Sequence, residues 1–272
     1  MLRITKQVMA RFAEAAALEF EDDMVRHVAK YFPDYHRLLG ESQIRLVVRH
    51  AVKRARGHRI DTERGICLYL TVMLMLGGNF DVDLWLPWAG DGLGELESPN
   101  ILVHQSIRMD KVANEAVTFL DSIYGPNNAY LTRVLSTVRK AIPELFLAGE
   151  PRSLLFLRKL FPQKVEALGD ELAQRLIDTA VDTAIRRGLT SWRGTTGYMV
   201  CSFLLGSGFD TDPLLPWATA ALNYPGSADV RADRLYEGGL GWLDGWLAMG
   251  MYPGGTTSID AFPSPSGGIR GL

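Results

Sequence analysis

Apolar residues recur at helical spacing along most of this chain, and alternating strand patterns are scarce. In the segment 41–57, apolar residues at positions 44, 47, 48, 51, 52 and 55 form one stripe along a helix. The segment 66–76 is apolar on every side, which predicts a buried helix. Asp61 or Thr62 is expected to cap this helix, and Gly77-Gly78 to end it; in the second copy, Thr190 or Ser191 and then Gly206 and Gly208 are expected to do the same. Further helices are predicted over 5–31, 107–124, 128–148 and 230–248, so the fold is predicted to be all-α.

One phrase of the chain is written twice. FDVDLWLPWA occupies 80–89, and FDTDPLLPWA occupies 209–218, which is 129 positions later. At this offset, 15 of 39 positions are identical between 51–89 and 180–218, without a gap. The period is far longer than that of a solenoid repeat, which is about 20–50 residues. The pattern therefore predicts a tandem duplication of a domain-sized unit.

The repeat divides the chain into three predicted parts. Two pseudo-symmetric helical bundle units are expected over residues 1–127 and 128–252. The second unit would end in a Gly/Trp-rich helix. Residues 253–272 are rich in Pro, Gly and Ser, which predicts a flexible, extended tail.

The repeated phrase is itself a candidate site, because it carries two aspartates two positions apart. In one interpretation, the aspartates cap the turn before Pro-Trp, and the aromatic residues fold back on the core. In the other, they bind a metal–nucleotide ligand in an enzyme, which would need further oxygen ligands nearby. Both copies keep the phrase with its apolar neighbours, which favours a structural motif and no metal. Its residues are Phe80, Asp81, Asp83, Pro87, Trp88, Phe209, Asp210, Asp212, Pro216 and Trp217.

A basic stripe lies on the predicted helix 41–57. It consists of Arg45, Arg49, Lys53 and Arg56, and Arg54, His58 and Arg59 widen it. The corresponding positions of the second copy are Gln174, Asp178, Asp182 and Ile185. Three interpretations stay open: both faces are solvated, the two faces meet between the units, or the basic stripe binds an acidic partner.

The predicted C-terminal helix is a second candidate surface. Trp242 and Trp246 are neighbours on one helical face, and Met249 follows them. Several glycines would let another element approach closely, at about 1 kcal/mol each relative to Ala. The segment is expected either to close the core of the second unit or to bind a partner.

Charge and composition narrow the classes of function. The net charge is −2 and the basic stripe lacks interleaved aromatic residues, so nucleic acid is not an expected partner. The two cysteines form no disulfide framework, and no apolar stretch is long enough to enter a membrane, so a cytoplasmic location is expected. The five histidines are expected to be scattered on the surface. No catalytic motif and no cofactor site are recognised.

The motifs FP…LG and LGxxFDxDxxxPWA, with the opening MLRIT, resemble a group of small bacterial proteins of unknown function. The genes of that group accompany type VI secretion spike and PAAR-tip proteins and their toxins. The resemblance covers about residues 1–125 and again 150–248. It implies a non-enzymatic adaptor or chaperone-like accessory that binds a spike, tip or toxin protein. An immunity-type inhibitor of a toxin is the first alternative, and a metal-dependent enzyme using the FDxD motifs is the second.

Overall fold

The computed structural model describes residues 5–94, 101–145 and 154–248, and over these ranges the chain is all-α, as predicted. The elements of the first half are α1 (Lys6–Tyr31), α2 (Pro33–Gly57), α3 (Glu63–Leu76), η1 (Phe80–Val82), α4 (Pro87–Gly92), α5 (Ile101–Tyr124) and η2 (Pro126–Asn128). Those of the second half are α6 (Ala129–Leu145), α7 (Leu154–Leu160), α8 (Pro162–Leu168), α9 (Asp170–Arg186), α10 (Trp192–Leu205), η3 (Phe209–Thr211), α11 (Pro216–Leu222) and α12 (Ala228–Ala248).

Elements recur in the same order in both halves. Helices α3 and α10 each span 14 residues and begin 129 positions apart. Thr62 caps α3 through its side chain and Ser191 caps α10 in the same way, each accepting the N–H of the residue three positions later. Gly77 and Gly206 end these helices with φ values of 112° and 103°. The capping and stop signals of the sequence therefore place the buried helices correctly.

Helix α2 begins earlier than predicted, at Pro33, and contains a break at Gly40. Gly40 has a φ of 74°, which glycine adopts without the steric cost that a Cβ would bring. Gly169, 129 positions later, has a φ of 77° and separates α8 from α9. The same glycine therefore bends the chain at the same point in both halves.

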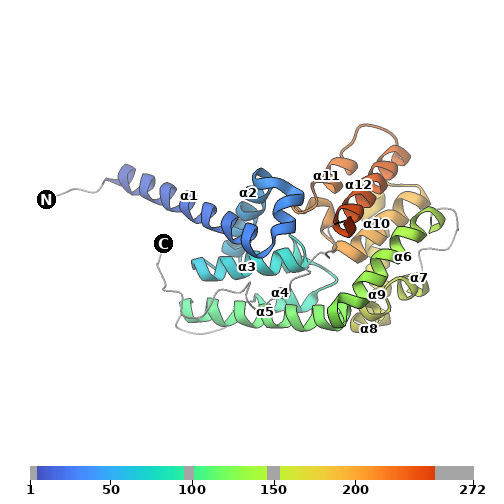
Figure 1. Ribbon diagram of the computed structural model, residues 1–272, viewed down its shortest axis with the longest axis horizontal. Helices are drawn as coiled ribbons and strands as arrows, with labels where there is room; N and C mark the ends of the chain where they lie inside the picture. The colour runs from blue at the N-terminus through green and yellow to red at the C-terminus, as the bar shows by residue number, and fades with distance from the viewer. Residues whose placement is uncertain (1–4, 95–100, 146–153, 249–272) are drawn as a thin grey trace.

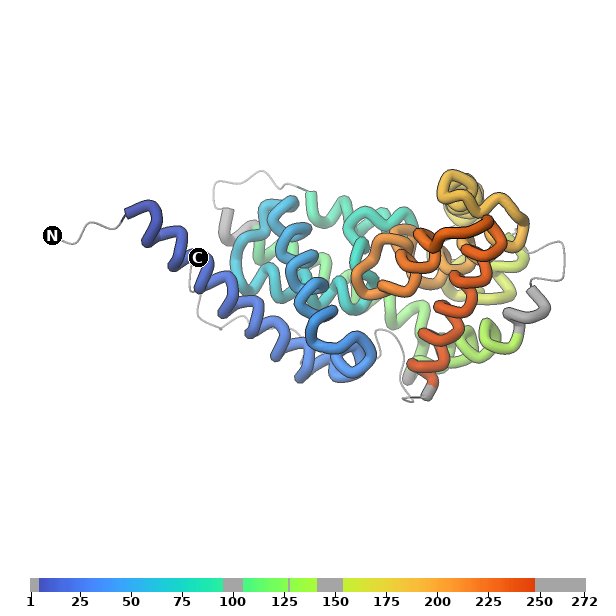
Figure 2. Tube along the Cα trace, turned by 90° about the horizontal axis from the view of Figure 1, so that it is seen from above, coloured from blue at the N-terminus to red at the C-terminus, as the bar shows by residue number. Residues whose placement is uncertain are grey.

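Figure 1 shows α1–α5 on one side of the molecule and α7–α12 on the other, with the first half of α1 extending away from the body. Helix α6 lies with the second half, beside α12. Figure 2, seen from above, shows the same protrusion of α1. None of the helices in the described ranges is long and apolar enough to cross a membrane.

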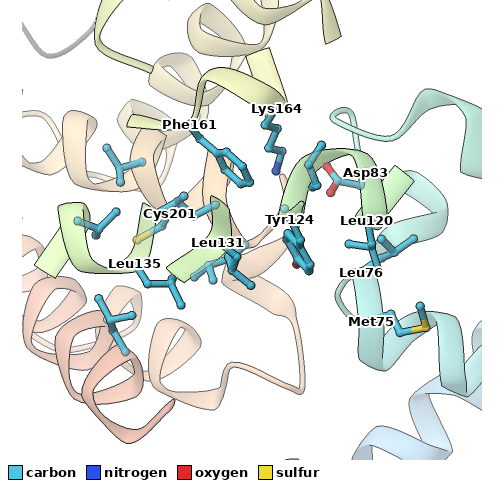
Figure 3. Close-up of a pocket in the computed structure, with 18 of the residues that line it drawn as sticks. Met75, Leu76, Asp83, Leu120, Tyr124, Leu131, Leu135, Phe161, Lys164 and Cys201 are labelled. Carbon is cyan, nitrogen blue, oxygen red and sulfur yellow. The ribbon is translucent and has the colours of Figure 1, made fainter. Parts of the chain in front are cut away.

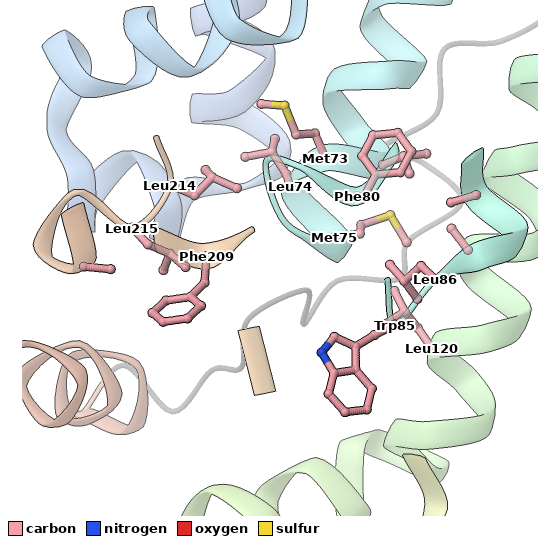
Figure 4. Close-up of a cluster of buried hydrophobic side chains, with 14 of the residues drawn as sticks. Met73, Leu74, Met75, Phe80, Trp85, Leu86, Leu120, Phe209, Leu214 and Leu215 are labelled. Carbon is pink, nitrogen blue, oxygen red and sulfur yellow. The ribbon is translucent and has the colours of Figure 1, made fainter. Parts of the chain in front are cut away.

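The two halves meet at the loops that carry the repeated phrase. These loops, residues 77–86 and 206–215, are called the joint below. Trp85 is buried against Phe203 of α10, with ring centroids 5.0 Å apart in an edge-to-face arrangement. Its indole Nε1–H donates to Ser202 Oγ at 3.2 Å. Figure 4 shows the apolar side chains that both phrases bury around the joint.

Candidate functional site

The second aspartate of each phrase bonds to the loop of the other half. Asp83 Oδ1 accepts the N–H of Ser207 at 2.9 Å, and Asp212 Oδ2 accepts the N–H of Gly78 at 2.6 Å. Gly78 and Ser207 are equivalent positions of the repeat, so the two hydrogen bonds are reciprocal. Each aspartate also accepts the N–H two positions later in its own loop, from Trp85 at 3.0 Å and from Leu214 at 2.7 Å.

One hydrogen bond between the two loops of the joint has no equivalent on the other side. Ser207 Oγ accepts the N–H of Leu84 at 2.9 Å. At the equivalent positions stand Gly78, which has no hydroxyl, and Pro213, which has no N–H. Neither side is therefore left with an unused donor. A Cβ on Gly78 would lie 2.2 Å from Asp212 Oδ1, so glycine is required there.

The first aspartate of each phrase holds the helix that precedes the buried helix. Asp81 accepts from Arg54 at 2.5 and 3.1 Å and lies 2.7 Å from His58 Nε2. Burial raises the pKa of Asp81, but hydrogen bonds from His58 and Arg54 outweigh it and keep the pKa at about 2. Asp210 pairs with Arg187 at 2.6 Å, and Tyr198 donates to it at 3.1 Å. Arg187 stands where the first half has His58.

These contacts correct one expectation. Asp81 binds Arg54 of α2, and Asp210 binds Arg187, which directly follows α9. The first aspartates therefore do not cap the turn before Pro-Trp, whereas Asp83 and Asp212 do. Phe80 and Phe209 are buried in the core, and Pro87 and Pro216 begin α4 and α11. Burial raises the pKa of Asp212 to about 6, against the two main-chain N–H donors. Among the described residues, no cluster of three or more metal-ligating side chains occurs. The aspartates are thus engaged by protein donors, which favours the structural interpretation.

A groove lies between α1 and α2 on the surface of the described residues. Its volume is about 780 Å³. One wall is an apolar stripe on α1 at helical spacing, made of Met9, Phe12, Ala13, Ala16, Ala17 and Phe20. The other wall comes from α2 and carries Val48, Arg49, Val52, Lys53 and Arg56. Phe12 is 66% exposed and Met9 57% exposed, so the outer part of the apolar stripe is uncovered.

The predicted basic stripe forms the inner end and the rim of this groove. Glu21 of α1 accepts from Arg49 at 2.7 Å and from Arg45 at 3.2 Å, and Asp22 accepts from Arg45 at 2.7 Å. Hydrogen bonds from Arg49 and then Arg45 lower the pKa of Glu21, in spite of its burial. Lys53 and Arg56 are exposed on the rim.

The contacts of the stripe disfavour one of its three interpretations and correct one expectation. Arg45 and Arg49 pair with Glu21 and Asp22 of α1, so these two arginines are not engaged by the acidic face of α9. Arg54 and His58 do not widen the exposed stripe, because both bind buried Asp81.

The C-terminal helix α12 turns its tryptophans inward. Trp246 is buried with its ring 4.9 Å from that of Tyr35, and Trp242 packs beside it at 5.8 Å. The glycine face admits another element as expected, because a Cβ on Gly238 would lie 2.7 Å from the indole of Trp217. Met249 and the tail 253–272 lie outside the described residues.

The expectation of surface histidines was wrong for those whose surroundings are described. Four histidines, at positions 27, 36, 50 and 58, are partly buried. His27 lies 3.3 Å from Thr71 Oγ1, and its burial lowers its pKa to about 4. His50 lies 3.1 Å from the carbonyl oxygen of Gly78. These rings pack the α1–α2–α3 side of the first half.

Sequence reasoning missed the apolar stripe of α1 and the buried Lys164. The stripe has a signal in the sequence, since its apolar residues recur every three or four positions along the segment that forms α1. Lys164 has none, because its burial depends on how α8 meets the joint. Searches against protein-family models, curated proteins and solved structures found no match to this chain.

Proposed function

We propose that this protein is a non-enzymatic, cytoplasmic protein-binding module that acts as an adaptor or chaperone-like accessory of a type VI-like toxin secretion system. The observation that carries the proposal is the open α1–α2 groove. An isolated helix gains little stability in water without a covered apolar face. The exposed stripe of α1 is therefore accounted for by a partner that buries it.

The groove favours an amphipathic helix as the bound segment. The apolar stripe of α1 in its wall can contact apolar residues at helical spacing on a partner, as in other helix-in-groove complexes. Lys53 and Arg56 stand on the rim, and acids of α1 do not neutralise them in the described structure. Acidic residues along one edge of the bound helix would complement this rim, which raises specificity and association rate more than affinity.

A photo-crosslinking experiment tests the proposal. A photoreactive amino acid is placed at Phe12, or at Leu155, in protein expressed in its native host. Leu155 is the matched control because it is an exposed apolar residue of the second half. Leu155 is 62% exposed, and Phe12 is 66% exposed. We expect one defined partner, a spike, tip or toxin protein, to cross-link at position 12 alone. Lys53→Glu with Arg56→Glu should abolish that cross-link.

Three results would contradict the proposal: no product at position 12, the same products at both positions, or a cross-link to a second copy of this chain. A cognate toxin as partner raises the inhibitor alternative, which co-expression separates. An inhibitor protects cells from the toxin, whereas an adaptor increases its secretion and leaves its toxicity unchanged.

A further inference from the structure

A cavity of about 130 Å³ lies between the two halves, beside the joint. Its walls come from the joint and from α3, α5, α6, α8, α10, α11 and α12, and they are mainly aliphatic and aromatic (Figure 3). A second space of about 60 Å³ adjoins it and shares Met75, Leu76, Tyr124, Leu204, Leu205 and Trp242. An apolar cavity of about 150 Å³ holds a molecule of the size of benzene. The space is therefore suited to a small organic ligand.

Lys164 extends from α8 into this apolar surrounding. It is only 7% exposed, and its Nζ donates to the carbonyl oxygen of Phe203. The ammonium also lies over the rings of Phe203 and Trp85, at 5.1 and 5.8 Å. No carboxylate of the described residues lies within 4.0 Å of it. Since an ammonium has three N–H donors, the described protein leaves this cation short of acceptors.

Other groups in the cavity wall add to this excess of donors. Trp217 and Trp242 line the cavity, and the indole N–H of each is buried without an acceptor in the described structure. Asp83 is the one carboxylate in this wall, and its Oδ1 already accepts two main-chain N–H groups. Burial lowers the pKa of Lys164 to about 8, and the charge of Asp83 opposes that shift. Lys164, Trp217 and Trp242 thus leave buried N–H donors without acceptors in the described wall, whereas its one carboxylate already accepts two main-chain N–H groups.

We propose that this cavity is a binding site for a small, uncharged, largely apolar molecule that carries one carbonyl group. The carbonyl oxygen accepts from Lys164 Nζ, and the hydrocarbon part lies among Leu131, Leu135 and Leu204. An anion is disfavoured, because Asp83 faces the same space. The site is separate from the α1–α2 groove, so the two proposals stand or fall independently.

Three probes of similar shape test the site: acetophenone, ethylbenzene and benzoate. Binding is measured by saturation-transfer NMR and by the rise in Tm that a ligand of the folded state produces. We expect acetophenone to bind about tenfold tighter than ethylbenzene, as a hydrogen bond from a charged donor provides. Lys164→Met should remove this difference. Lys159→Met, an exposed lysine of α7, should retain it.

The Lys164→Met variant is expected to fold, because a methionine of similar length replaces a buried charge in apolar surroundings. Leu135→Phe fills the space from α6 and should abolish binding of all three probes, which locates them in the cavity. The proposal is overturned if no probe binds, if ethylbenzene or benzoate binds as tightly as acetophenone, or if Lys164→Met keeps the preference.

Discussion

The segments that precede Phe32-Pro33 and Phe161-Pro162 differ between the two halves. In the first half this segment is one helix of 26 residues, α1, whose outer part stands free. In the second half it comprises α6 and the seven-residue α7, and α6 folds against α12. Met9 is 57% exposed, whereas Val138, 129 positions later, is 4% exposed.

Equivalent segments of the two halves therefore place their apolar residues in different surroundings. The second half covers its own apolar surface with α6, which also closes one side of the internal cavity. In the first half, α1 packs against α2 and leaves the outer part of its apolar stripe uncovered in the groove.

Removing the tryptophan of the joint should have the largest effect. We expect Trp85→Ala to lower the free energy of unfolding by about 4 kcal/mol, because it leaves a cavity beside Phe203 and deprives Ser202 of its donor. Leu214→Ala, at the equivalent position, should lower it by about 2–3 kcal/mol. Urea unfolding followed by circular dichroism measures both. An equal or smaller loss for Trp85→Ala would show that the joint is not anchored from the first half.

Placing a charge on each version of the divergent segment tests the comparison directly. Val138→Asp buries a carboxylate without a partner and should cost about 3 kcal/mol or more. Met9→Asp places the same group in water and should change stability by less than about 0.5 kcal/mol. Thermal unfolding of both variants provides the test. A destabilised Met9→Asp variant would mean that α1 packs against the body in solution.

Acid unfolding distinguishes the two first aspartates. The pKa of Asp81 is held at about 2, below its ordinary value of 3.8, so its stabilising contribution is present above pH 3.8 and is lost as the pH falls through 2. Asp81→Asn should therefore cost about 1–2 kcal/mol at pH 7 and flatten the stability profile between pH 4 and 2. Asp210→Asn should cost less, because its partner Arg187 is 43% exposed. Urea titrations from pH 2 to 7 provide the profiles.

The smallest effect is expected at Ser207 and Leu84. Ser207→Ala removes the acceptor of the Leu84 N–H and should cost about 0.5–1 kcal/mol. Adding Leu84→Pro removes that donor and reproduces the Gly78–Pro213 arrangement of the other side. A double-mutant cycle should then show positive coupling, with the second substitution recovering most of the loss. Strict additivity would indicate that water replaces the hydroxyl at no cost.

Local signals of the sequence predicted much of the fold. Helical periodicity, Thr62, Ser191 and the two stop glycines place the buried helices, because these choices depend on neighbouring residues only. The reciprocal bonds of Asp83 and Asp212 were not predicted, since their partners lie 124 and 134 residues away. The pairing of Arg54 and His58 with Asp81 had a partial signal, because the two lie four positions apart on one helical face. The sequence does not show which residue these two side chains bind, because that depends on how α2 packs against the joint.

A pair of equivalent hydrogen bonds that run in opposite directions is also what two identical chains form across a two-fold axis. Here both sides belong to one polypeptide, at an effective concentration on the order of millimolar, so dilution does not separate them. A dimer of identical chains must present the same residue twice, whereas a fused pair is free of that constraint. This chain has Tyr35 at one position and Lys164 at its equivalent, each facing an aspartate of the opposite loop. Within one chain, a single ammonium can therefore lie in the interface between the two halves, where two-fold symmetry would require a pair.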